Sequence, residues 1–96
     1  MASVIVTPVA GRNLVALTES HSLPDSTTER VRRALEPLRQ FPLLGATLEG
    51  RWAGFRFIVG PWRWMILVYR HDEAIDQVAV VTIRDGRSAR APKTSR

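Results

Sequence analysis

The chain has 96 residues, of which 45% are apolar and 24% charged, and it contains no cysteine. This length supports one hydrophobic core, and the apolar content is that of a folded protein, so a second domain and a disordered chain are both excluded. Without cysteine there is neither a disulfide framework nor a thiolate nucleophile, and two separate histidines do not make a zinc site. We expect a cytoplasmic protein that uses no metal or cofactor.

The longest unbroken apolar run spans residues 64–69, whereas a membrane helix needs roughly 20 residues. The N-terminus also lacks the basic and then apolar pattern of an export signal. We therefore expect a chain that neither spans a membrane nor is exported.

The net charge of +5 lies entirely in the second half of the chain. Residues 1–50 hold five basic and five acidic side chains, whereas residues 51–96 hold nine basic and four acidic ones. Thirteen of the fourteen basic residues are arginine, whose planar fork suits phosphates and carboxylates. The asymmetry favours a polyanionic partner, and an arginine-rich genome is the alternative explanation.

The first half of the chain predicts a strand and two helices. Ser3 to Val6 is a β-branched run, and Thr7-Pro8 supplies an N-cap hydroxyl and a first-turn proline for a helix that ends near Ser20. A break over residues 21–25 follows, in which His21 is expected to be a surface-loop residue. Ser26 to Glu29 has the pattern of a capping box, and Pro37 is expected to end or distort the second helix.

The second half predicts an antiparallel meander of three strands. Residues 55–59, 62–70 and 75–83 are rich in β-branched and aromatic side chains, and short turns at 60–61 and 71–73 separate them. The middle strand is apolar on both faces, which is typical of a strand covered by helices on one side and partly covered on the other. We predict an α+β domain over residues 1–87, of order β-α-α-β-β-β, with a helical hairpin packed on the antiparallel sheet. Residues 88–96 are expected to be a flexible basic tail.

Several short motifs occur in a fixed order along the chain. They are the opening strand with Thr-Pro-x-Ala, the pattern Leu-x-x-Leu-x-x-Phe-Pro-x-x-Gly over residues 35–45, Gly-Phe-Arg at 54–56, Gly-x-aromatic-Arg at 60–63, and the basic strand end at 83–87. In this order and spacing they resemble the RelE/ParE family of bacterial toxins from type II toxin–antitoxin systems. The resemblance implies a compact toxin that a cognate antitoxin wraps and neutralises.

The resemblance leaves three functions open. RelE-like members enter the ribosome and cleave mRNA, ParE-like members inhibit DNA gyrase without enzymatic chemistry, and an inactive relative would only bind its antitoxin. For the endoribonuclease, the resemblance implies a phosphate site made by Arg56, Arg63 and Arg87. Arg63 would hold the scissile phosphate, Arg56 would stabilise its charge, and Arg87 would assist near the leaving group.

Two positions depart from the nuclease pattern. Ile58 stands where such enzymes carry a second lysine, and Ile66 stands where a tyrosine usually follows the aromatic-Arg motif. A late tyrosine is also missing after Arg87. Arginine stays charged at physiological pH and is a poor proton donor or base, so proton transfer needs another group of the protein or help from the ribosome. His71 is one candidate, although its place beside Asp72 favours a solvated turn residue.

The remaining candidate residues concern binding. Arg51, Arg84 and Arg90 are hypothetical RNA contacts on the basic second half of the chain. Trp62 and Trp64 are interleaved with arginines and could stack on unpaired bases. Because large aromatic side chains more often pack in cores and interfaces, we favour packing against the helices or against an antitoxin, and we assign both residues to antitoxin binding.

Overall fold

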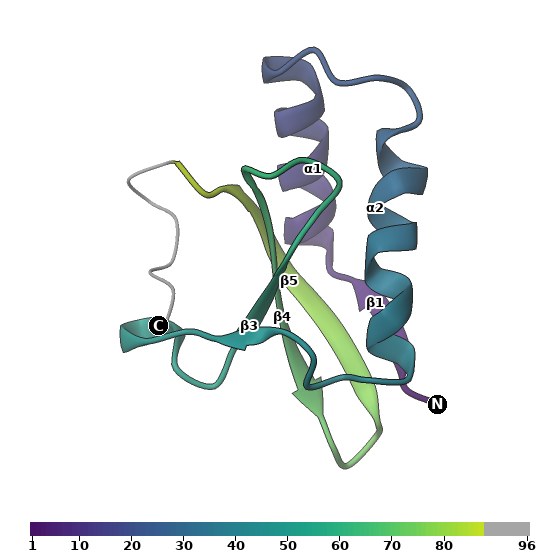
Figure 1. Ribbon diagram of the computed structural model, residues 1–96, viewed down its shortest axis with the longest axis vertical. Helices are drawn as coiled ribbons and strands as arrows, with labels where there is room; N and C mark the ends of the chain where they lie inside the picture. Colours follow the sequence, from purple (N-terminus) through teal and green to yellow (C-terminus); the bar gives the residue numbers. More distant parts are fainter. Residues whose placement is uncertain (88–96) are drawn as a thin grey trace.

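The computed structural model describes residues 1–87 and contains two α-helices, two 3-10 helices and five strands. In chain order these elements are β1 (Ser3–Val6), α1 (Pro8–Ser20), α2 (Thr27–Leu35), η1 (Glu36–Arg39), β2 (Ala46–Thr47), η2 (Gly50–Trp52), β3 (Arg56–Val59), β4 (Met65–Asp72) and β5 (Gln77–Asp85). The two helices lie side by side against one face of the sheet (Figure 1). The predicted α+β architecture is confirmed.

The sheet has the strand order β1-β5-β4-β3-β2. Strands β3, β4 and β5 form the predicted antiparallel meander. Two features were not predicted: β1 pairs with β5 in parallel, and the two-residue strand β2 extends the opposite edge. The sheet is therefore mixed, and β1 stands at its edge beside the last strand of the chain.

The junction between β1 and α1 follows the sequence closely. The Thr7 hydroxyl accepts a hydrogen bond from the Ala10 amide at 3.3 Å, as an N-cap does. The same hydroxyl donates to the Val80 carbonyl of β5 at 2.9 Å. Thr7 thus starts the helix and also fixes its first turn to β5, the strand next to β1.

The start of α2 differs from the predicted capping box. Ser26 occupies the N-cap position but makes no side-chain capping hydrogen bond, and the Glu29 carboxylate is held by Arg32 at 2.7 Å. The hydroxyl that stabilises this turn belongs to Thr27 and donates to the Pro24 carbonyl at 2.5 Å. As the sequence predicts, Pro37 stops the regular helix, which ends at Leu35 and continues as η1.

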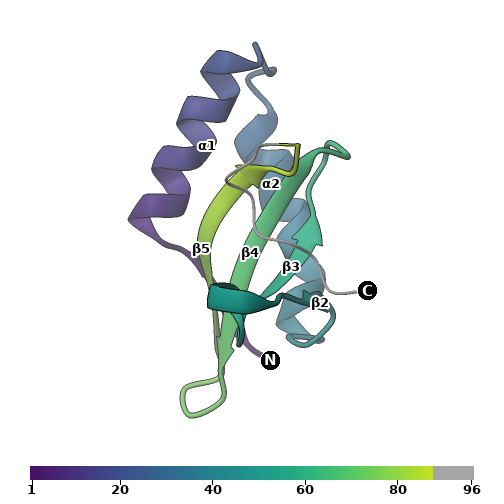
Figure 2. The same ribbon diagram turned by 90° about the vertical axis from the view of Figure 1, so that its left-hand side faces the viewer.

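The middle strand β4 is buried on both faces, as predicted. Met65, Leu67 and Tyr69 point into the main core under α1 and α2. Ile66 and Val68 point the other way, into a smaller cluster that the segment containing η2 covers. In Figure 2 this segment crosses the face of the sheet opposite the helices.

The boundaries of β4 correct two expectations. The strand begins at Met65 rather than Trp62, because residues 61–64 form a turn, and it continues to Asp72, so the hairpin loop spans residues 73–76. His71 therefore lies on the strand rather than in a solvated turn, and its side chain is only 11% exposed. Its Nε2 atom lies 2.9 Å from Asp76 Oδ1.

The predicted basic tail, residues 88–96, lies outside the described residues. Within residues 1–87, neither helix is long and apolar enough to cross a membrane.

Candidate functional site

Three segments far apart in the sequence meet at one end of the sheet. They are the end of α1 with His21, the turn 60–64, and the end of β5 with Asp85 to Arg87. We call this region the tryptophan end and define it by six residues: His21, Trp62, Arg63, Trp64, Asp85 and Arg87. The Gly86 amide donates to the Trp64 carbonyl at 2.5 Å, and the Met65 amide closes the turn on the Trp62 carbonyl at 2.9 Å. Backbone bonds therefore hold the turn and the end of β5 together.

The two tryptophans form the floor of the tryptophan end. Their ring centroids are 6.4 Å apart with an angle of 27° between the planes, and both side chains pack partly buried against the core beneath the helices. The Arg30 guanidinium of α2 lies 5.7 Å from the centre of the Trp62 ring. Packing of Trp62 and Trp64 onto the helical layer is thus as predicted, and their remaining exposed surface stays available to a partner.

His21 lies in the expected break between the helices, but its side chain is partly buried and takes part in this site. It caps the end of α1, and its ring stacks on Trp64 with centroids 4.3 Å apart and planes at 17°. Its Nε2 atom lies 3.1 Å from Asp85 Oδ2, and its Nδ1 atom lies 2.9 Å from the Ser20 hydroxyl. The partner Asp85 is 64 residues away in the sequence, so no local pattern signalled this contact.

Arg87 and Asp85 form a bidentate ion pair at the end of β5. The Arg87 guanidinium donates to both Asp85 carboxylate oxygens at 3.0 Å, and the Arg87 amide donates to Oδ1 at 2.9 Å. These bonds hold the pKa of Asp85 well below its usual value and raise the pKa of Arg87. The guanidinium also lies 5.5 Å from the centre of the Trp64 ring. Arg87 is thus positioned between an acid and an aromatic face.

Arg63 is exposed at the tryptophan end, as Arg87 is, but unlike Arg87 it has no carboxylate partner among residues 1–87. It lies in the turn before β4, so the prediction that it is part of a strand over residues 62–70 is wrong. The reason is that Met65 starts the regular strand, and the alternation of side chains begins only there. Within residues 1–87, no ion pair involves Arg63. Its guanidinium is the one best placed to meet an anion from solvent.

Arg56 lies at the other end of β3 and is tied to the loop before β2. Its Nη1 atom donates to the carbonyls of Gly45 at 2.9 Å and Leu43 at 3.3 Å. Arg56 and Val59 are three residues apart, which is about 10 Å along a strand. Arg56 is therefore separated from the tryptophan end by the length of β3.

A buried tyrosine supports the loop that Arg56 contacts. Tyr69 pairs with Arg56 across the sheet, and its hydroxyl accepts from the Gly45 amide at 2.8 Å. Burial raises the pKa of Tyr69. A Cβ atom at Gly45 would lie 2.6 Å from the Phe57 carbonyl oxygen and 2.7 Å from the Tyr69 hydroxyl oxygen, so this close approach requires glycine.

The predicted RNA contacts do not gather around the tryptophan end. Arg51 is exposed on η2, and Arg84 pairs with Ile66, whose side chain lies on the face away from the helices. Directly paired residues share a face, so Arg84 and Arg56 point to opposite sides of the sheet. The Arg84 Nε atom is buried without a hydrogen-bond partner. Arg90 lies outside the described residues.

Ile58, which replaces a lysine of the nuclease pattern, packs partly buried against the core beneath the helices. Ile66, at the tyrosine position, is buried on the opposite face. Both isoleucine side chains thus pack in apolar clusters.

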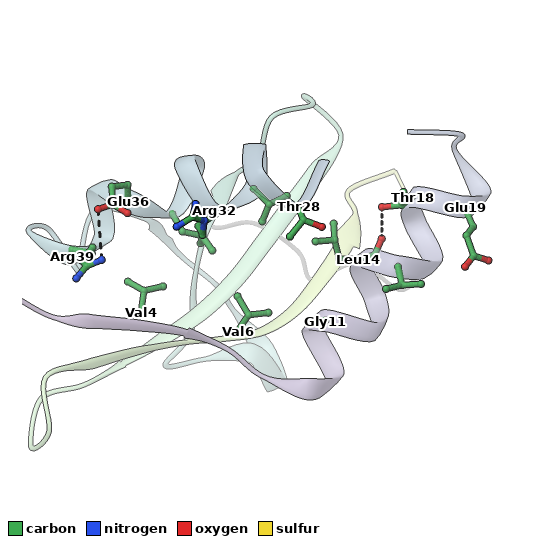
Figure 3. A pocket seen from close by; sticks show the side chains of 13 residues that line it. Val4, Val6, Gly11, Leu14, Thr18, Glu19, Thr28, Arg32, Glu36 and Arg39 are labelled. Carbon is green, nitrogen blue, oxygen red and sulfur yellow. Dashed lines mark hydrogen bonds and ion pairs between the residues drawn. The ribbon is translucent and has the colours of Figure 1, made fainter. Parts of the chain in front are cut away.

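A second notable feature is a groove between α1, α2 and the edge strand β1, with a volume of about 650 Å³. Figure 3 shows the side chains that line this groove, with Val4 and Val6 on β1, Leu14 and Thr18 on α1, Arg32 on α2, and Glu36 and Arg39 on η1. Val6 and Val15, two of its lining side chains, are 45% and 59% exposed. The rim carries Glu19, Arg32 and an Arg39–Glu36 pair at 3.7 Å. An amphipathic segment matches this combination of an apolar floor and a charged rim.

Neither a protein-family model nor a curated protein sequence matches the chain. Two solved structures do. The toxin–antitoxin complex RelBE2 from Mycobacterium tuberculosis matches with 26% identity and a TM-score of 0.64, and the match covers 88% of this chain and 96% of that one. The chromosomal ParDE TA system from P. aeruginosa matches with 16% identity and a TM-score of 0.68, over the same shares of the two chains.

The hairpin of helices on a sheet whose first strand pairs with its last is thus the fold of toxins from type II toxin–antitoxin systems. These two neighbours support the resemblance to the RelE/ParE family of toxins that the sequence motifs indicate.

Proposed function

We propose that this protein is the toxin of a type II toxin–antitoxin module and that it arrests growth by cleaving mRNA on the ribosome, in the cytoplasm. The observation that carries the proposal is the tryptophan end. There the exposed Arg63 and Arg87, whose guanidinium lies over the Trp64 ring, are next to the surface of two tryptophans. Guanidinium groups bind phosphate oxygens, and indole rings stack on unpaired bases. Single-stranded RNA presents phosphates and unpaired bases side by side, so it matches both kinds of side chain.

The proposed cleavage is attack of a ribose 2′-hydroxyl on the adjacent phosphate. Negative charge builds up on the phosphate oxygens as the new bond forms, and fixed cations lower the energy of that state. Arg63 binds the scissile phosphate, and Arg87 stabilises charge near the leaving oxygen, although an incoming phosphate must first compete with Asp85 for it. Arg56 lies about 10 Å further along β3 and contacts a neighbouring nucleotide. It does so with the guanidinium nitrogens that do not donate to backbone carbonyls.

Inhibition of DNA gyrase is the second candidate. Two observations favour it: the ParDE system is a structural neighbour, and the lysine position of the nuclease pattern is Ile58, packed against the core. This function requires binding only, so the missing lysine would not matter. An inactive relative that only binds antitoxin is the third reading, and a harmless, well-behaved monomer would favour it.

One pair of assays separates these functions. Induction of the toxin in cells, followed by primer extension on abundant transcripts, should reveal new mRNA 5′ ends within the coding regions. The same purified protein should leave gyrase supercoiling unchanged. Intact transcripts together with blocked supercoiling would replace the nuclease proposal by the gyrase one, and no effect in either assay would favour the inactive relative.

We further propose that the groove between α1, α2 and β1 receives an amphipathic segment of the cognate antitoxin. The support is its size, the exposed Val6 and Val15, the charged rim, and the outer edge of β1, which pairs with no other strand among residues 1–87. Both structural neighbours are toxin–antitoxin systems, which indicates the kind of partner. Trp62 and Trp64 remain our candidates for a second antitoxin contact.

Val15→Glu tests the groove, because Val15 is exposed and its substitution adds a buried charge only when a partner covers it. We expect binding of the co-expressed antitoxin to weaken by at least 10-fold, roughly 1.4 kcal/mol, while growth arrest persists. Ala16→Glu, at an exposed neighbouring position of α1 outside this groove, is the matched control. Equal antitoxin affinity for both variants would place the antitoxin elsewhere.

A further inference from the structure

The proposed cleavage lacks a group that moves protons. Arginines are fully protonated at physiological pH and do not act as bases, and the lysine and tyrosine positions of the nuclease pattern are occupied by the packed Ile58 and Ile66. A base must therefore come from elsewhere at the tryptophan end. Two histidines are available in the chain, His21 and His71.

His71 is far from the arginines of the tryptophan end. It stands at the opposite end of β4, paired with Val78 beside the hairpin loop, and its side chain is bonded to Asp76. His21, in contrast, stacks on Trp64 and contacts the same Asp85 carboxylate that binds Arg87. Of the two histidines, only His21 therefore lies beside the Asp85–Arg87 pair and the turn that contains Arg63.

The hydrogen bonds of His21 define which ring nitrogen can accept a proton. Asp85 is held in its ionised form by Arg87, and an ionised carboxylate only accepts hydrogen bonds. The Nε2 atom that faces Asp85 at 3.1 Å must therefore carry the hydrogen. In the neutral ring this leaves the lone pair on Nδ1, which the Ser20 hydroxyl contacts at 2.9 Å.

The lone pair on Nδ1 is within reach of solvent. Ser20 is exposed, and the His21 side chain is 28% exposed. An incoming hydroxyl can take the place of the Ser20 hydroxyl on Nδ1. The arrangement of carboxylate, imidazole and hydroxyl follows the logic by which an acid orients a histidine base in nucleophilic catalysis.

We propose that His21 is the general base of the RNA cleavage and that Asp85 is its positioning residue; this rests on the proposed nuclease function. Nδ1 takes the proton of the 2′-hydroxyl as its oxygen bonds to phosphorus, and the bond from phosphorus to the 5′ oxygen breaks. The leaving 5′ oxygen receives a proton from His21 through water, which returns the ring to its neutral form. The products are a 2′,3′-cyclic phosphate and a 5′-hydroxyl, with no net change in protons.

The test uses full-length protein in a translation extract, with primer extension on a reporter mRNA as the readout. His21→Gln should lower the cleavage rate by about 100-fold or more, the usual contribution of a general base. His71→Gln removes the other histidine–aspartate pair and is the matched control, with cleavage close to wild type. Asp85→Asn should cause a smaller loss than His21→Gln, because it leaves the imidazole in place.

Chemical rescue distinguishes a catalytic role of His21 as a base from a purely structural role. His21→Ala leaves space against Trp64, and added imidazole should restore cleavage without changing the thermal unfolding midpoint. Loss of cleavage with no rescue at any imidazole concentration would overturn the proposal, as would wild-type cleavage by His21→Gln while Arg63→Ala is inactive. If the wild-type protein itself cleaves no mRNA, the nuclease function fails, and the role of His21 falls with it.

Discussion

Arg56 and Arg63 stand at opposite ends of the β3–β4 hairpin, and their surroundings differ sharply. The Arg56 guanidinium donates to two backbone carbonyls beside a buried tyrosine and a glycine that admits no side chain. Arg63 is exposed in a turn next to stacked tryptophans, with no ion pair among residues 1–87. One arginine is bonded to the fold, and the other is open to solvent.

The difference matters because an arginine can either stabilise the fold or contribute to binding and catalysis, depending on its surroundings. Where a guanidinium satisfies carbonyls, removing it leaves those acceptors without a donor, and stability falls. Where it is exposed and unpaired, removing it costs little stability, and any loss falls on binding or catalysis. We therefore expect substitutions at the Arg56 end to act mainly on folding and those at the tryptophan end mainly on function.

The largest effect on stability should come from Tyr69→Ala. The side chain is fully buried in the main core, and removing a buried aromatic ring costs about 3–5 kcal/mol. Tyr69→Phe keeps the ring and loses only the contact to the Gly45 amide, for about 1 kcal/mol. Urea unfolding measures both. Equal stability of the two variants would mean that the ring is not packed as described.

Arg56→Ala should have the next largest effect, a loss of about 1 kcal/mol, because the carbonyls of Gly45 and Leu43 lose a donor. Arg63→Ala, measured in the same urea titration, should stay within about 0.5 kcal/mol of wild type. A reversed order would break the comparison between the two ends of the hairpin.

Acid should loosen the tryptophan end through Asp85. The pKa of Asp85 is lowered in the folded protein by hydrogen bonds from Arg87, so its stabilising effect is complete above the ordinary value of 3.8 and is lost progressively as the pH falls below that value toward the lowered pKa. Thermal melting at a series of pH values from 7 to 2.5 should show this loss. Asp85→Asn should be less stable at neutral pH, and its melting temperature should fall less steeply at acid pH. An identical pH dependence of melting in the two proteins would contradict the stabilising role of the Asp85 carboxylate.

The smallest effect is expected for Arg51→Ala. Arg51 is exposed on η2, on the segment that covers the face away from the helices, so stability should be unchanged and mRNA cleavage should fall by less than about 3-fold, a few tenths of a kcal/mol. A loss as large as that of Arg63→Ala would extend the RNA site onto this face of the sheet.

Much of the fold could be predicted from local patterns. Thr7-Pro8 starts α1, Pro37 ends α2, and the doubly apolar β4 lies between two clusters, because each of these signals acts through nearby residues. The parallel pairing of β1 with β5 could not be read in this way, since its partners are more than 70 residues apart.

The functional roles of the arginines and tryptophans stay predictions, whereas their geometry can be compared with the structure. Trp62 and Trp64 pack against the core beneath the helices, which is one of the two arrangements that the sequence analysis favoured. The start of β4 at Met65 moved Arg63 off the strand, however, and His21 joined the site only because folding brings the end of α1 to Asp85. A contact over such a sequence distance has no local signature.

The most direct test compares Arg63→Ala with wild type in a ribosome-containing translation extract, with primer extension for cleavage and urea unfolding for stability. We predict that wild type cleaves the reporter mRNA, and that Arg63→Ala loses at least about 10-fold in rate, roughly 1.4 kcal/mol, with an unchanged unfolding midpoint. Undiminished cleavage by Arg63→Ala would contradict the assignment of the tryptophan end as the working surface.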